Sequence, residues 1–337
     1  MLRDDGPRSR VELGDLTELS RSRLTVELDR LTERGLVDTA GMAASRGGRR
    51  SPMVRVAPGL RLAGIVVGTR SVSAAVTDGE LNVLSQVSEP IDARTGPDAV
   101  LGRVVELVDK LRAEVGESEL AGAAVGLPGP VSFADGVPVA SPDLPGWQRY
   151  PVGETLSAEL GCPTQVDNDA NLMALGERHA GVARPFDDFL FVKLGPAISC
   201  GIVLAGNLYR GSTGSAGDIG HLRVADDGPL CVCGATGCLE TRLGDDAPTL
   251  ATVRDGARQL GHALVGLVSF FNPGLVVIGG TGPGTGHALL AEIRGVVYRS
   301  SAPHATGNMP ILLSELGGEA GLVGAARLAS DHLFAAV

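Results

Sequence analysis

The stretch GHLRVADDGPLCVCGATGCLE, residues 220–240, combines three cysteines, one histidine and four glycines. Cys231, Cys233 and Cys238 offer three thiolates within one short loop, and His221 stands upstream as a fourth ligand. Three Cys and one His form a set that is typical of a closed, tetrahedral structural zinc site. The alternative, three reduced thiols in an apolar core, fits poorly with a segment so rich in glycine. The sequence therefore predicts a structural Zn²⁺ ion bound by these four residues.

The 337-residue chain is long enough for two or three domains. Hydrophobic residues make up 44% and charged residues 20% of it, a balance that excludes intrinsic disorder. No apolar run reaches the roughly 18 residues that a membrane span needs. The N-terminal sequence MLRDDGPRSR lacks the hydrophobic region of a secretory signal. We therefore expect a soluble, cytoplasmic protein without a membrane partner, in which clustered cysteines bind metal rather than form disulfides.

The charge of the chain is unevenly distributed. Residues 1–57 contain eleven Arg against nine Asp and Glu, which gives this segment a net charge of +2. Because the whole chain has a net charge of −10, the remaining residues carry −12. The acidic total therefore does not exclude a nucleic-acid partner for the N-terminal segment.

This N-terminal segment has the pattern of two helices followed by a basic hairpin. We expect helices at 9–17 and 20–35, the second capped by Ser20 and buried through leucines spaced along one face. Residues 36–59 resemble two strands joined by an arginine-rich tip. Such an order predicts a winged helix-turn-helix, whose second helix enters the DNA major groove while the wing contacts phosphates. The expected DNA contacts are Ser20, Arg21, Ser22 and Arg23 on the helix and Arg46, Arg49 and Arg50 on the wing. The alternative is a small helical domain with a solvated arginine loop.

Beyond Pro58-Gly59 the pattern changes to alternating strands and helices. The expected strands are 61–68, 71–78, 80–90, 121–129, 163–167, 187–194, 199–206 and 275–280, with long helices at about 97–115, 168–181 and 248–271. Two successive α/β series predict two lobes that close on a cleft. We expect a winged helix-turn-helix domain at 1–57, a small lobe at 60–165 plus 325–337, and a large lobe at 166–324 that carries the zinc site.

The segment VDNDANLMALGE, residues 166–177, places four Asx residues at the junction of a strand and a helix. One such residue would suffice as a helix cap. The surplus favours a polar ligand site, in which a carboxylate could accept a proton from a substrate hydroxyl, as in phosphoryl transfer.

With these motifs the chain resembles the ROK family (repressor, open reading frame, kinase), which groups bacterial sugar kinases with sugar-responsive repressors. The resemblance runs from about residue 10 to the C-terminus. It rests on the cysteine cluster and on GDIGH (217–221), NDAN (168–171), GLPGPV (126–131), LPGW (144–147) and NPGLVVIGG (272–280). It implies a two-lobed actin/hexokinase-like, or ribonuclease H-like, fold. The N-terminal segment suggests the transcriptional-regulator branch of the family.

The resemblance also implies roles for particular residues. Asp169 matches the catalytic base of the family's kinases, a role that it keeps only if kinase activity is retained. Asn168 matches a sugar contact beside it, and Asp169 itself is also expected to contact the sugar. Asp218 stands where the family has a sugar-binding glutamate, one methylene longer. His221 would both ligate zinc and touch the sugar, and Glu240 matches a further sugar-binding glutamate.

The positions that match the family's nucleotide-binding loops depart from its pattern. Val66 and Arg70 stand where the first phosphate loop has aspartate and threonine, and a valine cannot help to bind a hard cation. The second loop reads GPAISCG (195–201), in which Pro196, Ala197 and Ser199 replace a threonine and two glycines. A third turn, GGTGPG (279–284), is retained. We therefore expect weak or absent binding of ATP and Mg²⁺.

Three functions remain open from the sequence. The first is a sugar-responsive regulator that binds operator DNA and a sugar or sugar phosphate as a homodimer or homotetramer. The second is an ATP-dependent sugar kinase of the glucokinase or N-acetylhexosamine kinase type. The third is a regulator remnant that binds sugar but neither DNA nor ATP. Only MLRDDG precedes the first expected helix, so the winged helix-turn-helix domain is expected to have a truncated first helix or an upstream start.

Overall fold

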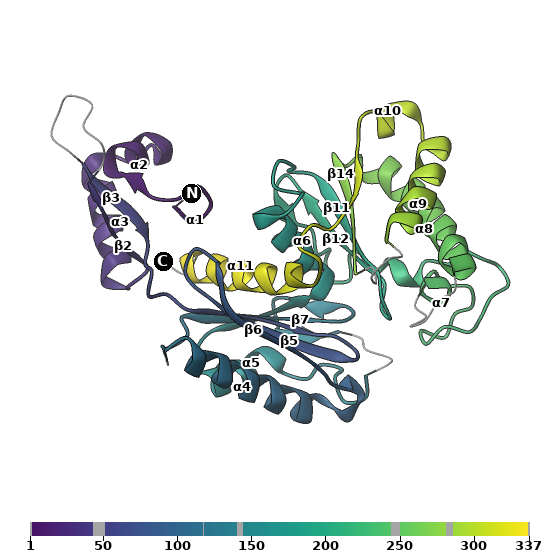
Figure 1. Cartoon of the computed structure of the whole chain (residues 1–337), viewed down its shortest axis with the longest axis horizontal. Coiled ribbons are helices and arrows are strands. Elements are labelled where there is room, and N and C mark those ends of the chain that lie inside the picture. Colours follow the sequence, from purple (N-terminus) through teal and green to yellow (C-terminus); the bar gives the residue numbers. More distant parts are fainter. Residues whose placement is uncertain are drawn as a thin grey trace.

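The computed structural model describes residues 2–335 except for 43–50, 117, 140–143, 244–249 and 281–285. The N-terminal domain contains α1 (Leu2–Asp5), β1 (Arg8–Ser9), α2 (Arg10–Thr17), α3 (Arg21–Glu33), β2 (Val37–Met42) and β3 (Pro52–Val56). Its strands form an antiparallel sheet in the order β1-β3-β2. The expected helix-turn-helix and hairpin are thereby confirmed, and they lie at one end of the molecule in Figure 1. The expected wing contacts Arg46, Arg49 and Arg50 lie outside the described residues.

Local sequence explains the ends and the packing of these helices. Ser9 and Glu12 form a reciprocal capping box at the start of α2. Ser20 caps α3 by accepting a hydrogen bond from the backbone N–H of Arg23. The buried side chains of both helices pack on the hairpin in one small core, formed by Leu13, Leu24, Leu28, Val37 and Val54.

The first lobe is built on a five-stranded sheet in the order β10-β7-β4-β5-β6. These strands are β4 (Leu62–Val67), β5 (Ser71–Thr77), β6 (Val83–Pro90), β7 (Gly122–Leu127) and β10 (Thr164–Asn168). One face is covered by α4 (Pro97–Glu114) and α5 (Val152–Leu160), and the opposite face by α11 (Ala320–Ala335). Short elements η1 (Ala93–Thr95), β8 (Val131–Ser132) and β9 (Val137–Pro138) complete this lobe.

The second lobe repeats this plan with a sheet in the order β13-β12-β11-β14-β15. Its strands are β11 (Phe189–Lys193), β12 (Ser199–Leu204), β13 (Asn207–Leu208), β14 (Leu275–Gly279) and β15 (Ile311–Leu313). Helices α8 (Leu250–Phe271) and α9 (Gly286–Ser300) pack on one face, and α6 (Asp169–Ala180) packs on the other. The remaining elements are η2 (Ile219–His221), α7 (Glu240–Leu243), α10 (Pro303–Thr306) and η3 (Gly317–Glu319).

The expected strands and long helices are confirmed to within a few residues, but two lobe boundaries shift. The expected boundary at residue 325 would cut α11, which packs as one helix on the first sheet and therefore belongs to the first lobe from Ala320 on. Residues 164–168 form β10, which pairs in parallel with β7 in the sheet of the first lobe. The expected boundary at residue 166 would cut this strand. The boundary therefore falls after Asn168, where the chain leaves the sheet and enters α6.

Helices α6 and α11 lie between the two sheets and are in backbone contact. A Cβ atom on Gly324 of α11 would overlap the carbonyl group of Leu172, and one on Gly176 of α6 would overlap that of Ala320. Only glycine permits so close an approach. The two helices therefore form one closely packed layer that joins the lobes (Figure 1).

No helix in the described part of the chain is long and apolar enough to cross a membrane.

Candidate functional site

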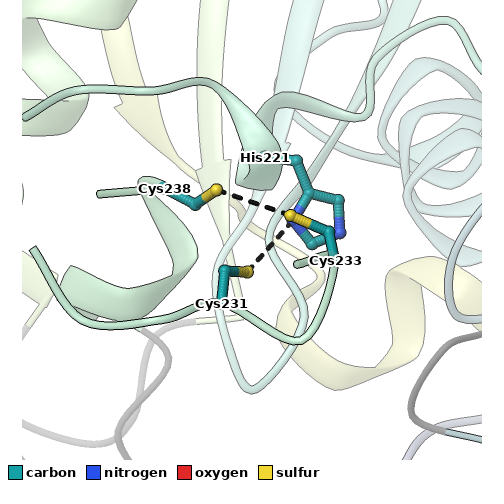
Figure 2. A group of neighbouring side chains, drawn as sticks. All are labelled: His221, Cys231, Cys233 and Cys238. Atoms are coloured by element: carbon teal, nitrogen blue, oxygen red, sulfur yellow. Dashed lines mark hydrogen bonds between the residues drawn. The ribbon is translucent and has the colours of Figure 1, made fainter. Parts of the chain in front are cut away.

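The four residues expected to bind metal converge in the second lobe (Figure 2). The ligand atoms of His221, Cys231, Cys233 and Cys238 all lie within 4.8 Å of one another. Cys231 Sγ is 3.5 Å from His221 Nδ1, and Cys233 Sγ is 3.6 Å from Cys238 Sγ. Four donors at this spacing can hold a single metal ion.

Backbone geometry shapes the cysteine loop. Gly234 and Gly237 adopt positive φ angles of 88° and 75°, which glycine tolerates at least cost. A Cβ atom on Gly237 would overlap the carbonyl of Ala225. Cys231 donates its backbone N–H to the carbonyl of Ala235 at 2.7 Å and closes the turn. The glycines therefore allow the chain to fold tightly around the thiols.

The electrostatics of this loop suit a bound cation. Burial raises the pKa of the Cys231 and Cys238 thiols, whereas a backbone hydrogen bond at Ala235 lowers the pKa of Cys233. Cys231 and Cys238 are buried and Cys233 is exposed. A buried thiol becomes a thiolate ligand when a metal ion offsets the cost of its charge. The donor set therefore fits a metal ion.

A pocket lies between the lobes, beside the metal cluster. Its wall contains four of the residues expected to contact sugar, Asn168, Asp218, His221 and Glu240. The rest of the lining is Thr69, Pro128, Gly129, Pro130, Leu144, Ala197, Ile198, Ser199, Gly214, Ser215, Ala216 and Gly217. His221 belongs both to the pocket and to the metal cluster. A metal ion held by the cysteines would therefore fix one wall of the pocket.

Asn168 both caps α6 and lines the pocket. Its Oδ1 accepts hydrogen bonds from the backbone N–H groups of Ala170 and Asn171, at 2.9 and 3.3 Å. Its Nδ2 donates to the carbonyl of Gly129 at 2.9 Å, across to the loop that follows β7. These bonds fix the side chain at the point where the two lobes meet.

Asp167 has a structural role that the sequence pattern did not separate from ligand binding. Its carboxylate is 1% exposed. It accepts hydrogen bonds from the Arg210 guanidinium at 2.8 Å, from the Asn171 amide at 2.8 Å and from the backbone N–H of Asn168 at 2.8 Å. The Arg210 side chain in turn stacks over the Phe133 ring at 4.0 Å. Asp167 therefore organises the strand–helix junction rather than the wall of the pocket.

Asp169, the residue that matches the kinase base, is buried against a lysine. Its side chain is 2% exposed, and its Oδ2 is 2.7 Å from the Nζ of Lys193, at the end of β11. Within the described residues this ammonium group is the partner of the carboxylate, which meets no other hydrogen-bond donor. Lys193 also donates to the carbonyl of Ala197 at 3.3 Å. Asp169 is thus not among the residues that line the pocket, and its carboxylate is paired with an ammonium group. The sequence did not predict this pairing.

Asp218 and Glu240 face the same pocket from the second lobe. Burial raises the pKa of Asp218, an effect that nearby His221 partly offsets. Glu240 accepts a hydrogen bond from the backbone N–H of Ile198 at 3.1 Å, which ties it to the loop between β11 and β12. Carboxylates held in this way can accept hydrogen bonds from hydroxyl groups of a ligand.

A second hollow adjoins the pocket on the side of the altered phosphate loops. Thr69 and Leu144 line both spaces, and the second is completed by Arg70, Arg94 and Pro196. Asp92 binds the Arg94 guanidinium through both carboxylate oxygens, at 2.9 Å each. Val66 packs towards Gly321 of α11, where a Cβ atom would lie 2.8 Å from the valine methyl. Of the retained third turn, residues 281–284 lie outside the described chain.

In the N-terminal domain, the expected DNA contacts of the second helix are at the exposed start of α3. Ser20, Arg21, Ser22 and Arg23 are all exposed, while Leu24 and Leu28 face inwards. This placement leaves the first turn of α3 accessible, as a helix that enters a groove requires.

A two-lobed α/β fold with an interlobe pocket and an N-terminal helix-turn-helix domain defines the class of the protein. The sequence profile of the ROK family matches residues 62–248, more than half of the chain. The chain belongs to the ROK family, and its fold is the family's actin/hexokinase-like fold.

Regulators and kinases of this family both resemble the chain, to different extents. A xylose repressor from Caldicellulosiruptor bescii is 24% identical over a 369-residue alignment that covers 96% of this chain and 92% of that protein. A glucokinase from Thermotoga maritima is 28% identical over 318 residues, which cover 82% of this chain and 99% of that protein. The crystal structure of a ROK family transcriptional regulator, a homologue of the E. coli MLC protein, superposes with a TM-score of 0.84 at 21% identity. That match covers 99% of this chain and 94% of that one. Nearly the whole chain, N-terminal domain included, thus has counterparts among regulators.

Proposed function

We propose that the chain is a cytoplasmic, sugar-responsive transcriptional regulator. Its N-terminal domain would bind operator DNA through Ser20, Arg21, Ser22 and Arg23 of α3 and through wing arginines Arg46, Arg49 and Arg50. The interlobe pocket would bind a sugar effector. Because operators of such proteins are commonly two-fold symmetric, we propose a homodimer or homotetramer. The proposed domains are 1–57, a lobe of 60–168 with 320–337, and a lobe of 169–319.

The observation that carries this proposal is the coexistence of two features in one chain. One is the exposed first turn of α3. The other is the pocket wall of Asn168, Asp218, His221 and Glu240, which offers several hydrogen-bonding groups for hydroxyls. A polyol needs a partner for each buried hydroxyl, since an unpaired polar group costs about 1–3 kcal/mol. Repressors among the relatives support the same conclusion.

We propose Zn²⁺ as the metal of the cluster, held by His221, Cys231, Cys233 and Cys238. Thiolate and imidazole donors select zinc over hard cations, and four protein ligands leave no open position for catalysis. The ion would brace the His221 side of the pocket and take no part in a reaction.

The contact between Asp169 and Lys193 is the main argument against a kinase. A general base must accept a proton from the sugar hydroxyl. The Asp169 carboxylate is 2% exposed, is paired with the Lys193 ammonium group at 2.7 Å and is not among the residues that line the pocket, so it is poorly placed to meet a sugar hydroxyl there. Val66 and Pro196 stand where a nucleotide needs an acid and a free amide. An ATP-dependent sugar kinase remains the second candidate function, favoured by the presence of Asp169 and by the related glucokinases.

The second hollow bears on the chemistry of the effector. Arg70 and Arg94 line it directly beside the sugar pocket. Guanidinium groups bind phosphate well. We therefore propose that the effector carries a phosphate group directed towards these arginines, with the free sugar as the weaker ligand.

The proposal is tested by fluorescence anisotropy with the full chain and a DNA duplex recovered by that chain from a random-sequence library. Glucose, xylose, N-acetylglucosamine and their phosphorylated forms are titrated in turn. We expect sequence-selective DNA binding that weakens steeply as salt increases and that changes when one of these sugars is added. The double variant Arg21→Ala/Arg23→Ala should lose DNA binding and keep sugar binding. Sugar binding without any DNA binding would instead support a remnant regulator, and Asp169-dependent release of ADP would support a kinase.

A further inference from the structure

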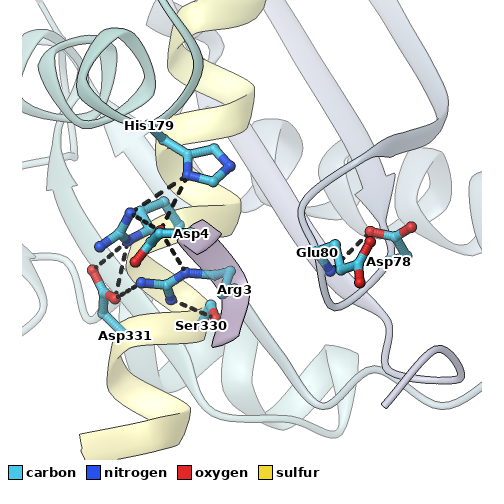
Figure 3. Close-up of polar contacts among 8 residues, drawn as sticks. Arg3, Asp4, Asp78, Glu80, His179, Ser330 and Asp331 are labelled. Carbon is cyan, nitrogen blue, oxygen red and sulfur yellow. Dashed lines mark hydrogen bonds and ion pairs between the residues drawn. The ribbon is translucent and has the colours of Figure 1, made fainter. Parts of the chain in front are cut away.

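The N-terminal domain is fastened to the C-terminal helix by a cluster of charged side chains (Figure 3). Arg3 of α1 lies 2.7 Å from Asp331 of α11 and donates to the Ser330 hydroxyl at 2.8 Å. The Arg3 side chain is 11% exposed, and Ser330 is fully buried. These residues are more than 320 positions apart in sequence. The contact therefore fixes how the DNA-binding domain sits on the lobes.

Asp4, the next residue, extends this cluster to α6. Its Oδ1 lies 2.9 Å from Arg327 of α11 and 3.5 Å from the Nδ1 of His179, in the last turn of α6. A hydrogen bond with His179, together with the charges of Arg327 and Arg3, holds the pKa of Asp4 well below its usual range. Asp4 is therefore an anion that binds both helices at once. We call Arg3, Asp4, His179, Arg327 and Asp331 the latch.

Helix α6 connects the latch with the pocket. It begins directly after Asn168, which lines the pocket, and its last turn carries His179, which belongs to the latch. Its 12 residues span about 18 Å at 1.5 Å per residue. A displacement of its first turn is therefore transmitted to its last turn, because a helix of this length behaves as a rod.

Helix α11 cannot absorb such a displacement. Gly176 and Gly324 bring the backbones of α6 and α11 into contact, so that no side chain intervenes to repack. Close-packed interfaces of this kind change between discrete arrangements rather than deform smoothly. Both helices supply residues of the latch, so a movement of one relative to the other alters its ion pairs.

We infer that the latch couples the sugar pocket to the DNA-binding domain through α6, an inference that rests on the proposed function. A ligand that draws Asn168 towards Asp218 and Glu240 displaces α6 and weakens the contacts of Asp4. The latched arrangement is the DNA-binding state, because a fixed domain orientation lets two α3 helices of a dimer meet two half-sites. Sugar and DNA then weaken each other's binding by the same factor, as linkage requires.

The test compares wild type with Asp4→Asn and His179→Gln in the full chain. DNA affinity is measured by anisotropy with and without the sugar that binds most tightly, among those named above. For the wild type we expect sugar to weaken DNA binding by a factor within the roughly 5- to 150-fold range usual for such coupling. In either variant we expect weaker DNA binding in the absence of sugar. The factor by which sugar weakens DNA binding should then shrink towards one. The double variant should lose no more than Asp4→Asn alone, since His179 acts on the N-terminal domain through its contact with Asp4.

Asp187→Asn is the matched control. Asp187 pairs at 2.9 Å with Arg178 of α6, which precedes His179 in the sequence, and the Asp187 side chain is 75% exposed. This variant should keep the wild-type coupling factor. Melting curves recorded for every variant separate a loss of coupling from a loss of folding.

Hydrogen exchange provides a readout without DNA. Sugar should raise the exchange of amides around Asp331 in the wild type, whereas Asp4→Asn shows raised exchange before sugar is added. The inference is overturned if both latch variants keep the wild-type coupling factor, if Asp187→Asn loses it equally, or if sugar and DNA bind the wild type independently. A chain that binds neither sugar nor DNA overturns the proposed function itself.

Discussion

The two sides of the interlobe pocket differ in what they retain. On one side, Asn168, Asp218, His221 and Glu240 form a wall of hydrogen-bonding groups beside the cysteine cluster. On the other, Arg70, Arg94 and Pro196 line a second hollow, and Arg70 and Pro196 stand at positions expected to match altered phosphate loops. Under the proposed function, hydroxyl recognition and phosphoryl transfer depend on separate parts of one fold. A chain can keep the first and lose the second, which is what a sensor derived from a kinase fold requires.

Loss of a metal ligand should weaken the sugar side of the pocket more than any other change considered below. Cys238→Ser removes a fully buried sulfur from the proposed zinc site. Structural zinc contributes folding free energy directly, so we expect loss of bound zinc, a lower melting temperature and at least about 100-fold weaker sugar binding. Elemental analysis, thermal melting and calorimetry measure these three quantities. Cys200→Ser, at a buried cysteine outside the cluster, is the control that should keep its zinc.

Removal of the ammonium partner of Asp169 should have the next largest effect. Lys193→Met leaves a nearly buried carboxylate without its counter-ion, a change that typically lowers the free energy of unfolding by about 3–5 kcal/mol. Urea denaturation of the purified chain measures the loss. Lys110→Met, at the chain's other lysine and on an exposed position of α4, should leave stability within about 0.5 kcal/mol of wild type. Equal stability of the two variants would show that the pair with Asp169 is unimportant.

Asp218→Asn should weaken sugar binding without unfolding the chain. A hydrogen bond to a charged group contributes about 1.5–3 kcal/mol, so we expect a loss of roughly 10- to 100-fold in calorimetric titrations. Asp226→Asn, at a fully exposed acid near the cysteine loop, is the control that should bind sugar normally.

The same residue should make sugar binding depend on pH. Burial raises the pKa of Asp218, so the folded chain takes up a proton at a higher pH than an ordinary aspartate does. Because the carboxylate is the better acceptor, sugar affinity should fall as the pH is lowered through this raised pKa and level off above it. The stability contribution has the opposite sign: protonation relieves the cost of a buried charge, so this group favours folding more as the pH falls. Titrations between pH 4 and 8 should show the decline in wild type and a flat profile in Asp218→Asn.

The smallest change in ligand affinity is expected from a substitution in the second hollow, which is proposed to bind the phosphate group of the effector. Arg70→Ala should weaken binding of the phosphorylated sugar by about 10-fold, because one charge-assisted contact is lost, and leave binding of the free sugar unchanged. Arg103→Ala, at an exposed arginine that is paired with Glu89 and lines neither the pocket nor the second hollow, is the control. A free sugar that loses affinity as much as its phosphate would contradict the assigned orientation.

The main features of the fold could be predicted from the sequence because each depends on local patterns. Apolar strands and capped helices have signals within ten or twenty residues, as at Ser20 and α3. The sequence predicts the lobe boundary at residue 166 rather than after Asn168. The reason is that β10 is continuous in sequence with the second lobe but pairs with the sheet of the first. Strand pairing is a long-range property that periodicity does not encode.

The site was predicted in part for the same reason. The cysteine loop and the NDAN segment are contiguous, and their spacing indicates their chemistry. Asp167 and Asp169 differ by only two positions, yet Arg210 and Lys193 give them different surroundings. The chain contains only two lysines, Lys110 and Lys193. This scarcity was the one sequence signal for the pair of Asp169 with Lys193. The latch had no sequence signal, since Arg3 and Asp331 meet only through the tertiary fold.

Calorimetric titration of the zinc-loaded full chain tests most directly whether the chain binds a sugar compound but no nucleotide. The chain is titrated first with the panel of sugars and sugar phosphates. It is then titrated with magnesium and a non-hydrolysable ATP analogue. We expect heat of binding with at least one sugar compound and none with the nucleotide at millimolar concentration. Submillimolar nucleotide binding, together with sugar phosphorylation that is abolished by Asp169→Asn, would contradict this expectation.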